Sequence, residues 1–405
     1  MKKFFWRIYQ FVFKLVAYFL PWRKPVLLSG AGVVLKVPEE LIKIKVSKVL
    51  VVTDMGIVKT GLMEPLLSEL KKNRIEYVIY DKTVPNPTIT NIEEATIMYQ
   101  QHSCQALIGF GGGTAIDCAK GVGAKLARPK KSIAKMKGVL KVGKRIPPLF
   151  AIPTTAGTGS EATLAAVVTN SQTHEKYAIN DVVLIPLYAV HDPLLTVNLP
   201  KNLTSTTGMD ALTHAVGAYI GNSNTQATSA CAKAAITLIF ENLEKAYQDG
   251  KNIEAREKML LASYYAGLAF TRAYVGNVHA MAHTFGGFYQ VPHGLANAII
   301  LPYVLDYYGN KAVKKLSQLA DLVKISNDDD SKEEKAQKFI KEIMLMNQRM
   351  NIPNYILIPN QDNITTMINR AYQEANPLYP VPMMFDKNDF AVLFNKVIKF
   401  EGENI

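Results

Sequence analysis

Cysteine is scarce in this chain of 405 residues. Cys104, Cys118 and Cys231 are odd in number, and no two of them stand in a CxxC spacing. Such a set does not build a disulfide scaffold, which needs an even number of paired cysteines. We therefore expect a protein of the reducing cytoplasm.

Motifs of nucleic-acid binding are also missing. The formal net charge of +12, from 46 Lys and Arg against 34 Asp and Glu, would suit an acidic partner. However, the basic residues are dispersed apart from a denser run over 120–144, and no aromatic-and-basic RNA motif accompanies them. We interpret that run as a solvated face and expect no nucleic-acid partner.

The chain has no long apolar run that is free of charge. The segment "MKKFFWRIYQFVFKLVAYFLPW" (1–22) comes closest, but polar side chains fall at helical spacing on one narrow stripe: Lys3, Arg7, Gln10 and Lys14. A membrane span needs about twenty apolar residues, and a secretory signal needs an uncharged centre and a small-residue cleavage site. Two interpretations of this amphipathic segment stay open. One is peripheral membrane contact through residues 1–22, and the other is a helix docked on another subunit or on the body of the protein.

Strand and helix patterns alternate over residues 23–199. Short apolar strands are predicted at 48–54, 77–81, 106–110, 148–153, 182–186 and 188–193. This alternation predicts an α/β domain with a mainly parallel sheet covered on both faces. After about Leu199 only helical periodicity follows, so we expect residues 200–405 to form an all-helical domain.

Two loops in the α/β domain are suited to phosphate. "GFGGGTAIDCAK" (109–120) places glycines between a strand and a helix N-terminus, where bare N–H groups and the helix dipole favour an anion. "IPTTAGTGSEAT" (152–163) also follows a strand and offers the hydroxyls of Thr154, Thr155 and Thr158. Two such loops at adjacent strand ends predict a dinucleotide cradle, since ligands bind at the carboxyl ends of parallel strands.

Histidines gather in "VHAMAHTFGGFYQVPHG" (278–294). His279 and His283 stand four residues apart, as do Asp210 and His214 in "GMDALTHAVGAY", so each pair lies on one face of a helix. His293 follows at a predicted helix start. A carboxylate with several imidazoles suits Fe²⁺ or Zn²⁺, whereas a lone histidine would be an ordinary core residue.

Together these motifs resemble the iron-containing (group III) alcohol dehydrogenase family. The resemblance runs from about Lys24 to about Pro377 and rests on "TDMG", "PNPT", "GGGTAIDCAK", "IPTTAGTGSEAT", "GMDALTHAVGAY" and "HAMAHTFGGFYQVPHGLANAIILP". It implies a dehydroquinate synthase-like architecture and a homodimer. It further implies that four residues hold the metal, Asp210, His214, His279 and His293, and that His283 lies beside the substrate.

The resemblance and the two loops lead to one set of predicted cofactor-binding residues: Asp54, Asn86, Gly112, Gly113, Thr114, Asp117, Thr154, Thr155, Thr158 and Lys176. Asp54 ends a strand, where its carboxylate can accept bonds from ribose hydroxyls and would repel a 2′-phosphate, so we expect NAD rather than NADP. The chain departs from the family at Gly217, where Glu is usual, and at "NPL" (376–378), where "NPR" is frequent. These departures do not change the predicted class of enzyme, but they leave its substrate undetermined.

The predicted activity is hydride transfer between a small primary or secondary alcohol, or its aldehyde or ketone, and the nicotinamide, with Fe²⁺ as the metal and Zn²⁺ as the alternative ion. One competing hypothesis is a glycerol dehydrogenase-like or other polyol enzyme of the same architecture. Another is a membrane-associated scaffold that keeps a dehydrogenase body. The complete ligand quartet argues against the scaffold.

Overall fold

A computed structural model describes residues 2–172 and 175–402 and divides into two compact units. The sheet unit comprises residues 21–199 and 250–264, and the helical unit comprises residues 2–20, 200–249 and 265–402. Helix α9 (Ile253–Ala273) contributes to both, with the change at Tyr264. The stretch 250–264 thus belongs with the first unit, although it lies far along the sequence from the rest of it.

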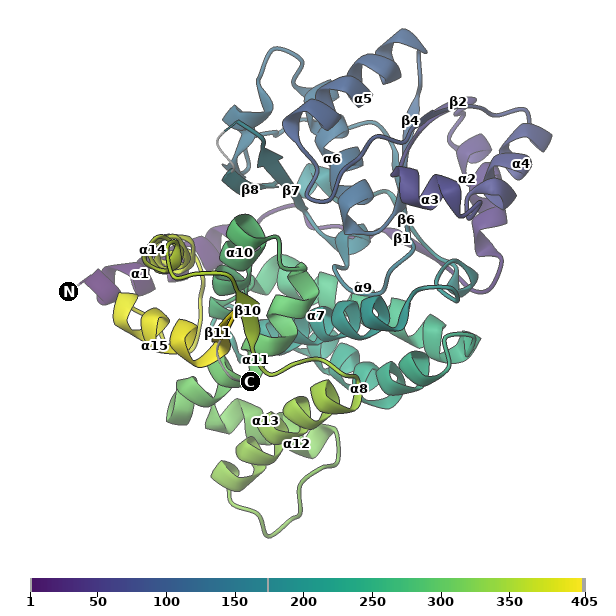
Figure 1. Cartoon of the computed structure of the whole chain (residues 1–405). Helices are drawn as coiled ribbons and strands as arrows, with labels where there is room; N and C mark the ends of the chain where they lie inside the picture. The colour runs from purple at the N-terminus through teal and green to yellow at the C-terminus, as the bar shows by residue number, and fades with distance from the viewer. Residues whose placement is uncertain (1, 173–174, 403–405) are drawn as a thin grey trace. The chain divides into compact units, whose positions relative to one another are not determined.

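The sheet unit is built on six parallel strands in the order β1-β9-β6-β4-β2-β3, of which β1, β2, β4 and β6 are labelled in Figure 1. Their bounds are β1 Val26–Ser29, β2 Lys48–Val52, β3 Glu76–Tyr80, β4 Ala106–Gly111, β6 Leu149–Pro153 and β9 Tyr188–His191. The central strand β4 is buried along its whole length, as is typical of parallel sheets with both faces covered. The parallel α/β prediction is therefore confirmed.

Alternate side chains of these strands pack into two cores, because successive strand residues face opposite sides. Leu50, Val52 and Leu107 share one core with side chains of α5 (Ile89–Gln101) and α6 (Gly113–Ala127). The opposite core contains Val51 and Ile108, together with side chains of α2 (Val37–Lys43) and α4 (Glu64–Lys72). The short helix α3 (Met55–Lys59) follows β2.

A smaller three-stranded sheet, in the order β5-β8-β7, completes the sheet unit. Its strands are β5 Gly138–Val139, β7 Ala165–Asn170 and β8 Glu175–Asn180, and β7 runs antiparallel to β8. The predicted strand at 182–186 is wrong, because Val182–Leu184 form a 3₁₀ turn whose start is capped by Asp181. An apolar run of this length does not by itself distinguish a strand from another buried segment.

Helices dominate the second unit: α7 Lys201–Ile220, α8 Gln226–Gln248, α10 Asn277–Tyr289, α11 His293–Tyr308, α12 Val313–Leu322, α13 Lys332–Arg349, α14 Ile364–Ala375 and α15 Lys387–Val397. Helices α7 and α11 are buried on nearly all sides, as expected for the centre of a bundle. The predicted helical second half is confirmed. It also holds a two-stranded parallel sheet of β10 (Ile356–Ile358) and β11 (Ile398–Phe400), strands too short to show a period in the sequence.

The N-terminal helix α1 (Lys2–Tyr18) belongs to the helical unit and lies beside α14 (Figure 1). Its polar stripe faces the protein: Gln10 is buried, and Lys14 Nζ donates to the carbonyls of Asn222 and Asn224. Its apolar face is exposed, with Phe4 and Phe11, and Phe19 directly after the helix, each about two-thirds or more accessible. This orientation is the reverse of an ordinary surface helix, which buries its apolar side. Within the described residues, no helix is long and apolar enough to cross a membrane.

Candidate metal centre and cofactor loops

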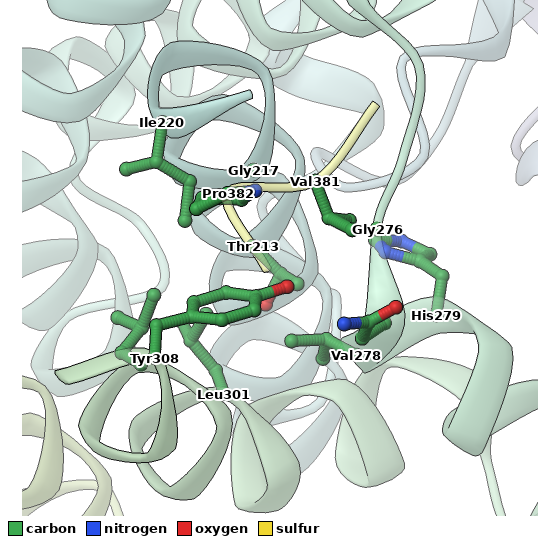
Figure 2. Close-up of a pocket in the computed structure, with 12 residues that line it drawn as sticks. Thr213, Gly217, Ile220, Gly276, Val278, His279, Leu301, Tyr308, Val381 and Pro382 are labelled. Carbon is green, nitrogen blue, oxygen red and sulfur yellow. The ribbon is translucent and has the colours of Figure 1, made fainter. Parts of the chain in front are cut away.

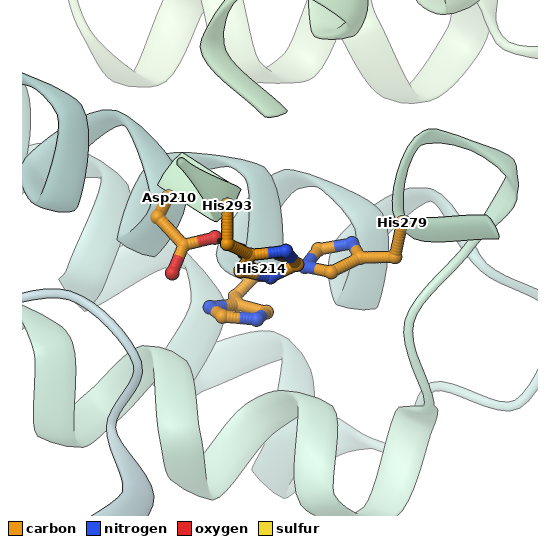
Figure 3. Close-up of side chains that lie close together, drawn as sticks. All are labelled: Asp210, His214, His279 and His293. Atoms are coloured by element: carbon orange, nitrogen blue, oxygen red, sulfur yellow. Dashed lines mark ion pairs between the residues drawn. The ribbon is translucent and has the colours of Figure 1, made fainter. Parts of the chain in front are cut away.

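Four side chains of the helical unit converge from three helices (Figure 3). Asp210 and His214 project from one face of α7, while His279 comes from the first turn of α10 and His293 opens α11. One ligand atom from each of the four lies within 4.8 Å of those of the others. The structure thus brings together all four residues that the sequence analysis assigned to a metal.

The carboxylate of Asp210 is central to this group. Its Oδ1 lies 3.8 Å from His279 Nε2 and 3.7 Å from His293 Nε2, and the side chain is almost fully buried. Three imidazoles and one carboxylate in a largely dry setting suit Fe²⁺ or Zn²⁺, which both accept nitrogen and oxygen ligands. The donor set therefore fits the metal that the sequence predicts.

Asn297 was missed by the sequence analysis. It is fully buried one turn after His293 on α11, and its Nδ2 donates to Asp210 Oδ1 at 2.6 Å and lies 3.1 Å from His293 Nε2. Groups that hydrogen-bond to metal ligands orient them. The only available signal was the i,i+4 spacing from His293.

His283 follows His279 by one turn but takes a different position. Its ring stacks on that of His293 with centroids 5.1 Å apart, and its Nδ1 lies 2.7 Å from Glu374 Oε1. The side chain is a quarter exposed, whereas those of His279 and Asp210 are buried. His283 is thus next to the quartet and outside it.

The two predicted phosphate loops lie side by side in the sheet unit. Strands β4 and β6 pair in parallel with Gly111 opposite Pro153, and Thr154 N donates to the Gly111 carbonyl at 3.0 Å. A Cβ on Gly113 would lie 2.6 Å from Thr158 Oγ1, so only glycine permits this approach. Helix α6 begins at Gly113, and among the described residues no side chain caps its N-terminus. Its first N–H groups can therefore face an anion.

Family models match both halves of the chain. The Iron-containing alcohol dehydrogenase model matches residues 25–193, and the model of the Fe-containing alcohol dehydrogenase family, C-terminal, matches residues 204–398. The chain belongs to the iron-containing alcohol dehydrogenase family. It is therefore an oxidoreductase that acts on alcohols.

Individual relatives agree with this assignment. "Alcohol dehydrogenase 4" of Saccharomyces cerevisiae is 36% identical over 380 residues, which cover 93% of this chain and 97% of the relative. The "NAD-dependent methanol dehydrogenase" of Bacillus methanolicus is 36% identical over 337 residues, covering 83% and 87% of the two chains. Among solved structures, a 1,3-propanediol oxidoreductase superposes with a TM-score of 0.89 at 34% identity, covering 93% of this chain and 99% of that one.

In this iron-containing alcohol dehydrogenase, Asp54 is the N-cap residue of a helix. Its side chain caps α3, with Oδ1 accepting from Ile57 N at 3.0 Å. A Cβ on Gly111 would lie 3.7 Å from the other oxygen, Oδ2, so Asp54 stands beside the first glycine loop. The nearby Asn86 is exposed in a left-handed turn after β3, and Thr114 lies in the first turn of α6.

Asp117 is engaged inside the protein. Ser160 Oγ donates to its Oδ1 at 2.5 Å and Val167 N donates to its Oδ2 at 3.0 Å. Burial raises the pKa of this carboxyl, while Lys120 and then Lys176 on β8 act in the opposite sense. Both oxygens thus accept bonds from the protein and brace the second loop, and contact of Asp117 with a cofactor stays a prediction.

Lys120 corrects the interpretation of the basic run as a solvated face. Its ammonium is fully buried and donates to Ser160 Oγ, to the carbonyl and hydroxyl of Thr163 and to the Ala165 carbonyl, at 2.8–3.0 Å. Burial lowers the pKa of Lys120 to about 8. The other lysines of the run are more exposed than Lys120. The sequence does not distinguish Lys120 from them.

A small cavity of about 20 Å³ lies on one side of His279 (Figure 2). Thr213, Gly217, Asn277 and Tyr308 contribute to its lining. A Cβ on Gly217 would meet no atom within 4 Å, so the absence of a side chain at this family-variant position leaves the space open. The volume suits a single water molecule and is too small for an alcohol with its carbon chain.

Proposed function

We propose that the protein interconverts small primary or secondary alcohols and their carbonyl products with NAD(H), at the centre formed by Asp210, His214, His279 and His293. The observation that carries the proposal is the convergence of these four ligand atoms within 4.8 Å. A divalent cation held there supplies Lewis acidity toward an alcohol or carbonyl oxygen. Fe²⁺ is the proposed ion, with Zn²⁺ as the alternative.

The chain's own residues supply orientation and proton handling. Asp210 gives the one negative charge of the quartet, which balances part of the charge of the cation, and Asn297 fixes the direction of its Oδ1. We propose that His283, beside the quartet and a quarter exposed, orients the substrate and accepts or returns the hydroxyl proton.

The cofactor is proposed to lie on the paired loops of the sheet unit. The uncapped start of α6 and the hydroxyls of Thr155 and Thr158 support a role in binding the pyrophosphate. Asp54 Oδ2, the oxygen that does not cap α3, supports recognition of a ribose hydroxyl and hence NAD over NADP. Lys176 is proposed to act through its charge beside Asp117.

A substrate panel with metal analysis on the same sample tests this function. We expect NAD-dependent oxidation of short aliphatic alcohols, reduction of the matching aldehydes with NADH, and about one Fe²⁺ or Zn²⁺ per chain. Activity should disappear after chelation and return with added metal. Full activity in the chelated, metal-free protein would contradict the proposal. The polyol-specific alternative is not favoured by the comparisons, and activity confined to glycerol-like polyols would restore it.

We also propose that the protein is a cytoplasmic homodimer that contacts membranes peripherally through residues 1–22. Three cysteines without a disulfide support the reducing compartment, and the homodimer follows from the family resemblance. Nine large apolar side chains of α1, and Phe19 directly after it, are exposed. No acidic residue precedes Glu39, whereas basic residues occur at both ends of the segment, namely Lys2, Lys3, Arg23 and Lys24. An exposed aromatic face with basic flanks suits an anionic bilayer surface.

Cosedimentation with vesicles tests the membrane contact. The full chain should sediment with phosphatidylserine-containing vesicles and less with neutral ones. Replacing Phe4, Phe11 and Phe19 by Ser should lower the vesicle partition coefficient of the protein roughly tenfold, since each ring contributes to the apolar area buried in the membrane. The matched control replaces Val26, Leu140 and Val392, which are exposed apolar side chains outside α1. If the triple α1 variant changes only the oligomeric state and neither form binds lipid, the face is a subunit contact.

A further inference from the structure

Glu374 forms a direct contact with the proposed catalytic histidine. Its Oε1 lies 2.7 Å from His283 Nδ1, joining α14 to α10 across the helical unit. Both side chains are roughly a quarter to a third exposed, so neither is simply buried packing. Nothing in the sequence marked Glu374, because it lies 91 positions from His283.

A second donor fixes the same carboxylate oxygen. Tyr379 OH donates to Glu374 Oε1 at 2.8 Å from a buried position. Burial, and next the charge of Glu374, raise the pKa of Tyr379 well above its usual value, so the hydroxyl keeps its proton and acts as donor. A carboxylate only accepts, and His283 Nδ1 therefore carries the hydrogen that it shares with Glu374. In the neutral ring, Nε2 is then the nitrogen that carries no hydrogen and can accept a hydrogen bond.

The loop that carries Tyr379 is held by the N-terminal helix. Gln10 Nε2 donates to the carbonyl of Pro377 at 2.7 Å and to that of Tyr379 at 2.9 Å. Arg7 donates to the Pro382 carbonyl at 3.2 Å. The polar stripe of α1 thus binds the backbone of the segment that positions Tyr379 against Glu374.

We infer that Glu374 is a positioning residue for His283. It orients the imidazole and selects the tautomer with hydrogen on Nδ1, while Tyr379 and the α1 contacts hold the carboxylate in place. Glu374 acts only through His283 and touches no reacting atom. The inference rests on the proposed role of His283 and deepens it.

Substitution of Glu374 tests the inference. Glu374→Leu puts an apolar side chain, one bond shorter, in place of the carboxylate and removes both acceptor oxygens, so kcat for alcohol oxidation should fall about 10- to 100-fold. KM for alcohol and for NAD should change less than about twofold, and metal content should stay at the wild-type level, because no ligand is altered. Glu374→Gln retains one acceptor oxygen and should recover most of the lost rate. The control is Gln373→Ala, an exposed neighbour on the same helix, which should match wild type. Unchanged kcat in Glu374→Leu overturns the inference.

A double-mutant cycle separates positioning from general support of the fold. In a His283→Ala background, adding Glu374→Leu should cause no further loss of kcat, since a group acting through His283 has nothing left to position. A further loss equal to that seen in the wild-type background would show that Glu374 acts elsewhere. If Glu374→Leu does not fold, Tyr379→Phe serves instead. It removes one of the two donors to the carboxylate and should lower kcat by several-fold at constant metal content.

Failure of the inference and failure of the proposed function give different results. A wild-type protein with no NAD-dependent alcohol activity contradicts the function. An active wild type whose rate is unaffected by Glu374→Leu contradicts only the role of Glu374.

Discussion

Two histidines one helical turn apart have different neighbours in this protein. His279 enters the metal quartet, whereas His283 stacks on His293 and bonds to Glu374. An i,i+4 spacing predicts that both lie on one face of a helix and no more, because the direction of each ring depends on what packs against that face. The sequence alone therefore indicated a cluster, and the family resemblance distinguished ligand from neighbour. Asn297 and Glu374 were not predicted, because residues that hydrogen-bond to a site belong to no sequence motif of their own.

At the same scale, Asp54 gives a prediction about cofactor choice. Asp54→Asn keeps an oxygen that can cap α3 and removes the charge facing a 2′-phosphate. We expect the ratio of kcat/KM for NADP to that for NAD to rise about tenfold or more, corresponding to at least about 1.4 kcal/mol. Asp54→Gly should raise it similarly at a small cost in stability, since Gly is a tolerable cap. Equal use of both cofactors by the wild type would remove this role from Asp54.

At the scale of elements, the paired loops were predictable and their support was not. Glycines and hydroxyls after two predicted strands indicated adjacent loops, since parallel strands end at the same edge, and β4 does pair with β6. The brace beneath them consists of Asp117 and Lys120 on α6, which both contact Ser160 of the second loop. A lysine in a basic run is predicted to lie on the surface. Only the tertiary fold places carbonyl acceptors around the ammonium of Lys120.

The brace predicts a large effect from a single lysine. Lys120→Met should lower the free energy of unfolding by about 2–4 kcal/mol, because the acceptors around the ammonium lose their donor in a buried site. Thermal and denaturant unfolding measure this, and weaker NAD binding should accompany it. The matched control is Lys130→Met, an exposed lysine of the same run, for which we expect a change within about 0.5 kcal/mol. Equal stability of the two variants would show that the Lys120 bonds contribute nothing net.

At the scale of the whole molecule, the sequence pattern predicts the change from alternating strands and helices to helices alone near Leu199. Strand-forming stretches before it and 3.6-residue periodicity after it follow directly from which faces are buried. Two features were beyond this pattern. Residues 250–264 belong to the sheet unit because the first part of α9 packs there, with Ser263 Oγ accepting from Gly159 N at 3.1 Å. The orientation of α1 could not be predicted, because an amphipathic pattern does not determine which face of the helix packs against the protein.

The most direct test of the metal centre is metal analysis with kinetics on three histidine variants prepared side by side. His279→Ala and His293→Ala each remove one ligand nitrogen, so they should retain much less metal than wild type and lose turnover by about 10³-fold or more. His283→Ala should keep the wild-type metal content and lose turnover by about 10²- to 10⁴-fold, the range of acid–base assistance. His102→Ala, at an exposed position of the sheet unit, is the control and should match wild type in both. Full metal content and full rate in His279→Ala would contradict the assignment of the quartet.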